Sequence, residues 1–416
     1  MESNWLAWLI LTALIITFLV ETVAELFNLS TLTPEPPPGL ADVYPPEEYA
    51  RSQRYTKAKT RFGLLTGAFD LAITVAFWLA GGFAWLDLWV RGLNLGQVVS
   101  GLTYLGSLLL VRTLVSLPFS IYATFWLEER YGFNRTTIGT FIADLGKGLL
   151  LAVVLGGPLL AGVLFLFNRA GAGAWLYAWA MTSLFVVLMQ FIAPAWIMPL
   201  FNTFTPLAEG ELRERILAYA RSVGFALDNV LVIDGSKRSN KSNAFFTGFG
   251  SHKRVALYDT LIEGHGVDEL VGVLAHEIGH YQKRHIIKGM ALGILHLGVM
   301  LYLLSLALTS QGLFSAFGLT HPSTYVGLAI FGLLVSPLEL ILAVLMNAIS
   351  RRHEFEADRF AADTLGNGQP LILALKKLAA HNLANLTPHP FFVFLHSSHP
   401  PLQARVEALR HPPLKT

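Results

Sequence analysis

The sequence of 416 residues contains no cysteine, and only 14% of its residues are charged. Without cysteine the chain can form no disulfide, bind no metal through a thiolate and use no cysteine nucleophile. Its formal net charge of +2 at pH 7 gives no basic excess, so we expect no nucleic-acid partner. In contrast, 53% of the residues are hydrophobic, which is typical of a protein whose partner is the lipid bilayer.

Long apolar runs predict the fold class. A helix needs about twenty apolar residues to cross a bilayer, and the chain has seven such runs, more than a soluble core of this length can hide. We therefore predict a mainly α integral membrane protein with seven transmembrane helices. The first run lacks a basic start and is too long for a signal peptide, so we expect it to stay as an anchor. The predicted spans cover residues 5–27, 62–86, 99–127, 148–167, 174–201, 286–308 and 325–349.

The distribution of lysine and arginine between these spans predicts their orientation, because cytosolic loops carry these residues in excess. The segments after the first and third spans are rich in them, as at Arg54 and Arg130. The segments after the second and fourth spans hold only Arg91 and Arg169, and the one after the sixth holds none. This pattern predicts an N-terminus outside, with the region between spans five and six, and the tail after span seven, in the cytosol.

The strongest local signal is the sequence HEIGH at 276–280. Because a helix turns once every ~3.6 residues, His276 and His280 project from one face and can bind a single Zn²⁺. Glu277 is turned about a quarter of a revolution away and can reach a water molecule at the metal and act as its base. Apolar residues at helical spacing continue through the motif, and Asp268 is the expected N-cap. We expect one zinc ion per chain.

A catalytic zinc site needs a third protein ligand. The metzincin arrangement is excluded, because the positions of its glycine and third histidine hold Lys283 and Ile286. Glu354 and Asp358 lie four residues apart on one face of a predicted helix, which suits one ligand and one carboxylate that orients a liganding histidine. The alternative is a solvated helix face on which Arg351 and its neighbours pair with these acids. The upstream histidine motif favours the ligand interpretation.

The main polar region, 202–285, has an α/β pattern, with a helix expected at 212–223 and strands at 229–233 and 255–258. The apolar stretch 243–250 begins with an asparagine. In zinc peptidases an exposed strand beside the metal pairs with the extended substrate backbone, and an asparagine can hydrogen-bond that backbone. The alternative is an ordinary hairpin with aromatic packing. The expected peptide contacts are Asn243, Ala244 and Phe245.

Some charged residues fall inside the predicted spans, where charge is costly and faces a cavity or a partner. Asp70, Arg112 and Glu339 indicate a polar interior, such as a water-filled chamber. A structural pair of Asp70 with Arg112 explains two of them equally well.

These patterns divide the chain into four regions. Residues 1–201 form an N-terminal membrane region with spans one to five, and 202–285 form the zinc-peptidase region. Residues 286–349 hold spans six and seven, and 350–416 form a C-terminal cytosolic region that carries the third ligand. The predicted topology places both halves of the metal site on one side of the membrane, although two spans separate them in sequence.

Further motifs, spread over nearly the whole chain, resemble those of the type I CAAX prenyl protease family, which are multi-pass membrane zinc metallopeptidases. The motifs are ERYGFN (129–134), PLFNTFTP (199–206), SNAFF (242–246), AHEIGH (275–280), SRRHEFEAD (350–358) and SHPP (398–401). The resemblance implies seven helices that enclose a large intramembrane chamber, capped on the cytosolic side by the zinc domain.

The resemblance also implies roles for individual residues. It gives His276, His280 and Glu354 as zinc ligands and Glu277 as the catalytic acid and base. Substrate contacts fall on Asn243 and on His399, which can also stabilise the oxyanion. We expect Asp358 and Arg351 to orient the ligands.

Members of this family remove the last three residues of prenylated CAAX proteins, and some also make a second cut or clear jammed translocons. The cysteine-free composition, rich in alanine, leucine and glycine, favours a bacterial source and hence the bacterial inner membrane. In a bacterial inner membrane, the alternative role is quality control of membrane proteins by a protease that has no prenylated substrates.

Three other classes compete with this interpretation. A site-two-type protease carries the zinc motif inside a span, whereas here the polar residues 281–285 follow it. The bacterial heat-shock membrane protease uses similar chemistry but fewer spans. A seven-span transporter or receptor with a structural metal is disfavoured, because structural zinc sites have four protein ligands.

Overall fold

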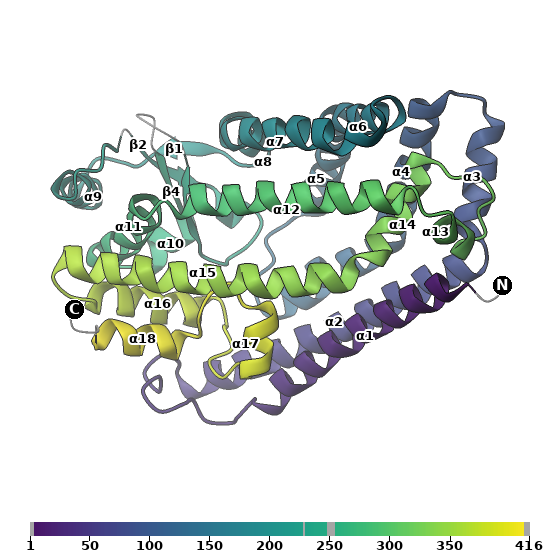
Figure 1. Cartoon of the computed structure of the whole chain (residues 1–416). Helices are drawn as coiled ribbons and strands as arrows, with labels where there is room; N and C mark the ends of the chain where they lie inside the picture. The colour runs from purple at the N-terminus through teal and green to yellow at the C-terminus, as the bar shows by residue number, and fades with distance from the viewer. Residues whose placement is uncertain (1–3, 228, 248–253, 412–416) are drawn as a thin grey trace.

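The computed structural model describes residues 4–227, 229–247 and 254–411. Long helices extend from the end of the molecule that carries the β-sheet to the end that carries α3 and α13 (Figure 1). This arrangement confirms the predicted, mainly α membrane fold. The helices before the sheet are α1 (Trp5–Ser30), α2 (Pro46–Leu79), α3 (Gly82–Gly92), α4 (Gln97–Tyr122), α5 (Ile138–Leu151), α6 (Gly157–Arg169), α7 (Ala174–Ile192) and α8 (Met198–Phe201).

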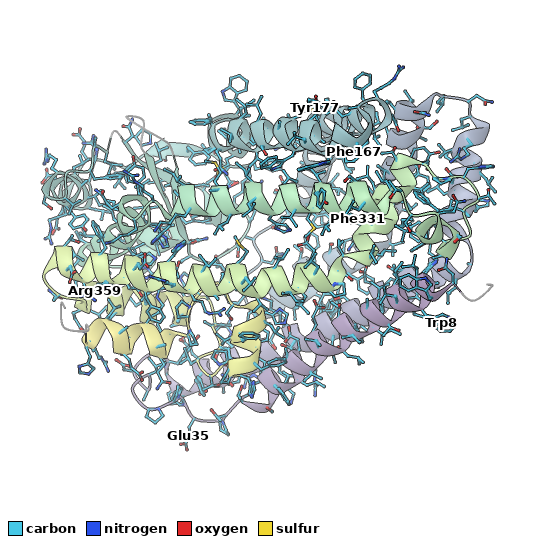
Figure 2. The ribbon with its side chains drawn as sticks, in the orientation of Figure 1. Trp8, Glu35, Phe167, Tyr177, Phe331 and Arg359 are labelled. Carbon is cyan, nitrogen blue, oxygen red and sulfur yellow. The ribbon has the colours of Figure 1, made fainter. Side chains whose placement is uncertain are left out.

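Within the described part of the chain, six helices are long and apolar enough to cross a membrane. Their outer surfaces are apolar: the side chains of Trp8 on α1 and Tyr177 on α7 are 61% and 59% exposed and point away from the bundle (Figure 2). Phe331 lies between helices and is only 8% exposed. Lipid is the solvent that such an apolar surface requires. The six are Trp5–Ser30, Pro46–Leu79, Gln97–Glu128, Ile138–Arg169, Gly171–Phe201 and His285–Ala307.

Several of these long helices contain π-helical turns, in which the hydrogen-bond ladder is one residue wider and the helix bends locally. They continue α4, link α5 to α6 and link α7 to α8. A short 3₁₀ turn precedes α7. These turns are η1 (Ala123–Glu128), η2 (Ala152–Gly156), η4 (Ala193–Ile197) and the 3₁₀ turn η3 (Gly171–Gly173).

Two predicted spans differ from the observed helices. The second was expected to run to residue 86, but α2 ends at Leu79 because Gly81 adopts a left-handed φ of 75° and begins the separate helix α3. The seventh is broken into α14 (Thr324–Leu334) and α15 (Ser336–Leu365), which meet at a bend of 59°. Pro337 in the first turn of α15 has no N–H for a continuous ladder. The described residues therefore contain six helices able to span a membrane, or seven if the bent pair counts as one, and the count of seven and the enclosed chamber stay predictions.

The polar region contains a four-stranded sheet of order β1-β2-β4-β3. The strands β2 and β4 are parallel, and the other two pairs are antiparallel. Both predicted strands are present, and the helix expected at 212–223 is α9 (Glu211–Ser222). The stretch 243–250 contains β3 at an edge of the sheet, while its residues 248–250 lie outside the described part. The strands are β1 (Phe204–Pro206), β2 (Asn229–Ile233), β3 (Ala244–Thr247) and β4 (Arg254–Tyr258), and the 3₁₀ turn η5 (Gly235–Lys237) follows β2.

Helix α11 carries the histidine motif and lies in the core of this region. Its Leu270, Leu274 and Ile278, at helical spacing, are at most 1% exposed and pack among the buried apolar residues of the sheet and surrounding helices. Its N-cap is Gly266 and not Asp268, which lies in the first turn, where the helix dipole also favours an acid. The remaining helices of the chain are α10 (Asp259–Gly264), α11 (Val267–Gln282), α12 (His285–Ala307), α13 (Gln311–Ala316), α16 (Gln369–His381), α17 (Pro390–His396) and α18 (Leu402–Arg410).

Helices α11 and α15 approach closely at a glycine. A Cβ atom added to Gly279 would lie 3.0 Å from both the Cα and the carbonyl oxygen of Ala357 on α15. Only a residue without a side chain lets the two backbones come this near. The glycine of the HEIGH motif is therefore a packing residue, and it brings the acidic part of α15 up to the histidines.

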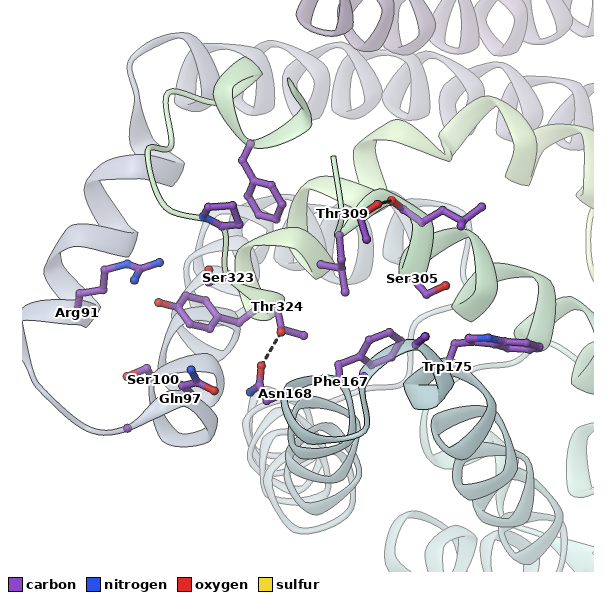
Figure 3. A pocket seen from close by; sticks show the side chains of 18 of the residues that line it. Arg91, Gln97, Ser100, Phe167, Asn168, Trp175, Ser305, Thr309, Ser323 and Thr324 are labelled. Atoms are coloured by element: carbon purple, nitrogen blue, oxygen red, sulfur yellow. Dashed lines mark hydrogen bonds between the residues drawn. The ribbon is translucent and has the colours of Figure 1, made fainter. Parts of the chain in front are cut away.

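Two large hollows lie among the membrane helices. One hollow, of about 960 Å³, lies at the ends of the helices remote from the metal-binding region. Helix α12 starts next to α11 and is about 35 Å long, and residues near its C-terminal end line this hollow. Figure 3 shows Arg91, Ser100 and Trp175 around it, and Thr324 donating to Asn168 Oδ1 at 2.6 Å. The other, of about 900 Å³, is mostly apolar and lies between α2, α4, α6 and α14.

The charged residues expected inside the spans have partners. Arg112 and Asp70 line the apolar hollow as an ion pair 3.7 Å apart, which is the structural pair weighed from the sequence. Glu339 Oε1 lies 3.1 Å from Nε2 of His296 on α12. The carboxylates of Asp70 and Glu339 are thus each matched by a basic side chain.

Gly279→Ala is expected to lower the stability of the protein, because the new methyl group must push α15 away from α11. Overpacking of this kind costs about 1–3 kcal/mol. Thermal unfolding of the detergent-solubilised chain measures the effect. Gly289→Ala in α12 is the matched control, since its Cβ would meet nothing within 4 Å. An unchanged midpoint for Gly279→Ala would show that the two helices are not in tight contact.

Candidate metal centre

Three side chains from two helices converge at one point. On α11, His276 Nε2 and His280 Nε2 are 3.1 Å apart. Glu354 of α15 places its Oε1 3.2 Å from the second of these nitrogens and its Oε2 3.5 Å from the first. Each of the three offers one possible ligand atom, and the three atoms lie within 4.8 Å of one another. The structure therefore brings together the residues that the sequence predicted as metal ligands.

The spacing of these atoms fits a zinc ion. Tetrahedral ligands at about 2.0–2.2 Å from zinc lie about 3.3 Å from each other. The two histidine nitrogens are 3.1 Å apart, and Oε1 and Oε2 of Glu354 lie 3.2 Å from the nitrogen of His280 and 3.5 Å from that of His276. Glu354 Oε2 is buried and makes no hydrogen bond among the described residues, although a guanidinium lies 3.3 Å away. A buried carboxylate oxygen in this state favours a cation. Three protein ligands would leave the fourth position open, as in catalytic sites.

The orientation of His276 is set by a buried ion pair. Its Nδ1 lies 2.9 Å from Asp358 Oδ1, so the ring directs Nε2 toward Glu354. Both oxygens of Asp358 in turn accept from Arg405 of α18, at 2.8 Å from Nε and 2.6 Å from Nη2. Burial alone would lower the pKa of His276, but hydrogen bonds to Asp358 and Glu354 outweigh it and raise that pKa to about 9. The acids around this ring make the site attractive to positive charge.

Glu277 follows His276 on α11 and is half-buried. Burial raises the pKa of its carboxyl group, while the two neighbouring histidines oppose the shift. A carboxylate with a raised pKa is suited to accept and return a proton near neutral pH.

His399 reaches the site from the segment after α17. Its Nε2 lies 3.4 Å from Glu354 Oε1, its Nδ1 lies 2.9 Å from the Ser398 hydroxyl, and 63% of its side chain is exposed. Partial burial lowers the pKa of this imidazole. Among the described residues Arg351 pairs with no carboxylate, and it donates to the carbonyl oxygens of Val393 at 3.1 Å and Ser397 at 2.7 Å. It ties α15 to the chain that leads to His399, rather than orienting the ligands directly.

The edge strand β3 lies against α11 and pairs only with β4 among the described residues. Asn243 precedes it and is exposed, with Oδ1 accepting from the Ala244 N–H at 2.8 Å. The preceding residue is held by Asn382, which accepts from the Ser242 N–H at 3.0 Å and donates to its carbonyl at 3.2 Å. In the strand, Phe245 is the partner of a β4 residue. The strand β3 is thus positioned against the helix that carries the two histidines.

The sequence interpretation missed Arg405 and Asn382. Neither belongs to a motif of the sequence analysis, and each reaches the site from a helix or helix end late in the chain. A signal did exist for Arg405: it lies beside Val406 on the apolar face of α18, where a lone basic residue implies a buried acidic partner. No comparable pattern marks Asn382.

A multi-pass membrane fold with two histidines of an HExxH helix and a distant glutamate around one open position defines the class of membrane metallopeptidases. Comparisons with known proteins agree. Residues 25–203 match the model of the CAAX prenyl protease N-terminal region with five membrane helices, and residues 206–413 match peptidase family M48. The chain belongs to this family of zinc metallopeptidases.

Individual relatives extend over almost the full length. CAAX prenyl protease 1 of Saccharomyces cerevisiae is 37% identical, covering 90% of this chain and 88% of the relative. The CAAX prenyl protease 1 homolog of Homo sapiens is 31% identical, covering 95% and 92%. The crystal structure of S. mikatae Ste24p superposes with a TM-score of 0.91 at 36% identity, covering 97% of this chain and 98% of that one.

Arg405→Ala is expected to destabilise the protein by about 3–5 kcal/mol, because it leaves Asp358 buried without its cation. The loss is measured as a lower unfolding midpoint of the metal-free chain in detergent. Arg410→Ala, an exposed arginine on the same helix, is the matched control and should leave the midpoint nearly unchanged. Equal midpoints for the two variants would contradict a structural role of the Asp358–Arg405 pair.

Proposed function

We propose that one Zn²⁺ per chain binds His276, His280 and Glu354 and that the enzyme uses it to cut peptide bonds. The observation that carries this proposal is the convergence of three possible ligand atoms within 4.8 Å of one another, together with a buried oxygen of Glu354 that makes no hydrogen bond among the described residues. In this proposal Asp358 orients the ring of His276, and Arg351 positions the segment that carries His399.

Zinc bound there supplies Lewis acidity toward the scissile carbonyl and the attacking water. Glu277 takes the proton of that water and returns it to the leaving amine, a role that its raised pKa suits. His399 donates a hydrogen bond to the oxyanion of the tetrahedral intermediate, since its Nε2 faces the same space as Glu354. Every proton transferred thus has a donor and an acceptor among these side chains and the substrate.

The substrate peptide binds as an added strand along β3. The open edge of this strand beside α11 supports the proposal, because backbone N–H and C=O groups on an edge strand pair with an extended chain. Asn243 contacts the peptide backbone at the start of the strand, and Ala244 and Phe245 continue the contact. Backbone pairing is tolerant of sequence, so further specificity must come from elsewhere in the substrate.

We propose that the substrates include proteins with a prenylated C-terminus. The support is the extent of the similarity, since relatives named CAAX prenyl proteases match both the membrane region and the peptidase region. The second proposed role is quality control of membrane proteins without a lipid group. It is favoured by the composition, which points to a bacterial inner membrane, although the relatives named above are eukaryotic.

The active site faces the cytosol in this proposal, and the N-terminus lies outside. The support is the excess of lysine and arginine in the segments after spans one and three, which lie on the same side as the peptidase region.

Glu277→Gln is expected to reduce peptide cleavage by about 100- to 10,000-fold, the contribution of a positioned acid and base. Zinc content should stay at that of the unchanged chain, because Glu277 is not a ligand. Cleavage of a quenched fluorescent peptide and metal analysis of the same sample measure the two quantities. Asp268→Asn, an exposed acid in the first turn of α11, is the control. Unreduced turnover of Glu277→Gln would refute its assignment as the base.

Removal of zinc by a chelator is expected to stop cleavage of both a farnesylated and an unmodified CAAX peptide, and added zinc should restore it. A higher kcat/KM for the farnesylated peptide supports the prenyl-protein role, and equal values support the quality-control role. Cleavage that survives complete metal removal would exclude a metallopeptidase mechanism.

A further inference from the structure

His285 begins α12 immediately after the tight turn that ends the metal-binding helix. At this turn Arg284 adopts a left-handed φ of 57°, which is uncommon for a residue with a side chain. The reversal folds His285 back against α11, where its side chain is buried. Its Nδ1 then lies 3.1 Å from Nδ1 of His280, the nitrogen of that ring which faces away from Glu354.

The other nitrogen of His285 meets an acid of α15. Its Nε2 lies 3.1 Å from Glu356 Oε2, and the second oxygen of Glu356 accepts from Arg352 Nε at 3.0 Å. The ring of His353 stacks on that of His285, with centroids 3.9 Å apart and planes within 11°. The imidazole of His285 is therefore fixed in position and in rotation.

Metal binding by His280 determines which nitrogen carries the proton in each of these hydrogen-bonded histidines. If His280 gives Nε2 to a metal, its proton is on Nδ1 and is donated to Nδ1 of His285. His285 then carries its own proton on Nε2 and donates it to Glu356. Each contact has one donor and one acceptor, and no proton is missing or in excess.

The two liganding histidines are thus supported differently. His276 meets the carboxylate of Asp358 directly, at 2.9 Å. His280 meets a carboxylate, Glu356, through an intervening imidazole. Glu354, Glu356 and Asp358 all come from one stretch of α15, so a single helix supplies a ligand and the outer partner of each histidine.

We propose that His285 and Glu356 are positioning residues that hold the metal ligand His280 in the correct tautomer and orientation. This inference rests on the proposed zinc site. A carboxylate or similar partner behind a liganding histidine makes the ring a better ligand, and its loss lowers metal affinity by about 10- to 100-fold.

The test measures zinc affinity of the full-length chain in detergent by competition with a chelator, together with the visible spectrum of the cobalt-substituted protein. His285→Phe keeps the stacked ring but removes both hydrogen bonds, and it should weaken zinc binding by about 10- to 100-fold and alter the cobalt spectrum. His285→Asn should restore most of the affinity, since its Oδ1 can accept from His280 Nδ1. Glu356→Gln should lower the zinc affinity by about 10-fold, the lower end of the same range.

Asp363→Asn is the matched control, because it breaks another pair spaced by four residues, with Arg359, on the same helix. Zinc affinities of His285→Phe and Glu356→Gln within twofold of the unchanged chain would overturn the inference. If His285→Phe does not fold, the affinity of Glu356→Gln decides. If the unchanged chain itself bound no zinc, the proposed function would fail as well, whereas normal binding and cleavage with unaffected variants would reject only the positioning role.

Discussion

The contact between α11 and α15 at Gly279 is the constraint on which the rest of the site depends. The two helices are separated in sequence by α12, α13 and α14, which cross the membrane region and return. Their backbones can approach only because Gly279 has no side chain to meet Ala357. This approach brings Glu354 within ligand distance of both histidines of α11. The close packing of α11 against α15 at this glycine therefore also determines where the proposed metal ligands lie.

Burial of charge explains why a late helix belongs to the site. Two carboxylates on one buried face, Glu354 and Asp358, repel each other and lose solvation. Arg405 of α18 and the histidines of α11 offset this cost, and a divalent cation would offset it further. The site is thus incomplete until the C-terminal helix has packed. The segment carrying His399 lies just before that helix, so docking of α18 also delivers the proposed oxyanion donor.

The sequence predicted those parts that depend on local spacing. His276 and His280 follow from helical periodicity, and the membrane helices from their apolar length, whereas the choice of Glu354 over Asp358 as the third ligand came from the family resemblance. The bend between α14 and α15 was missed because a hydropathy window averages over Pro337. Asp268 was misplaced as the cap because Gly266 leaves no side-chain signal. Arg405 and His285 could not be placed, since their roles depend on where helices from other parts of the chain pack. An edge strand at β3 was anticipated, and its binding of substrate stays a proposal, but Asn382, which holds the residue before Asn243, was not anticipated.

The account rests on zinc held by two imidazoles and one carboxylate with an open position. Zinc K-edge X-ray absorption of the purified, metal-loaded protein tests this most directly. The predicted result is one zinc per chain with two imidazole ligands and the remaining ligands oxygen, at about 2.0–2.2 Å. Replacement of Glu354 by Gln should then weaken zinc retention. A chain that retains no zinc, or a zinc ion closed by four protein ligands, would contradict the account.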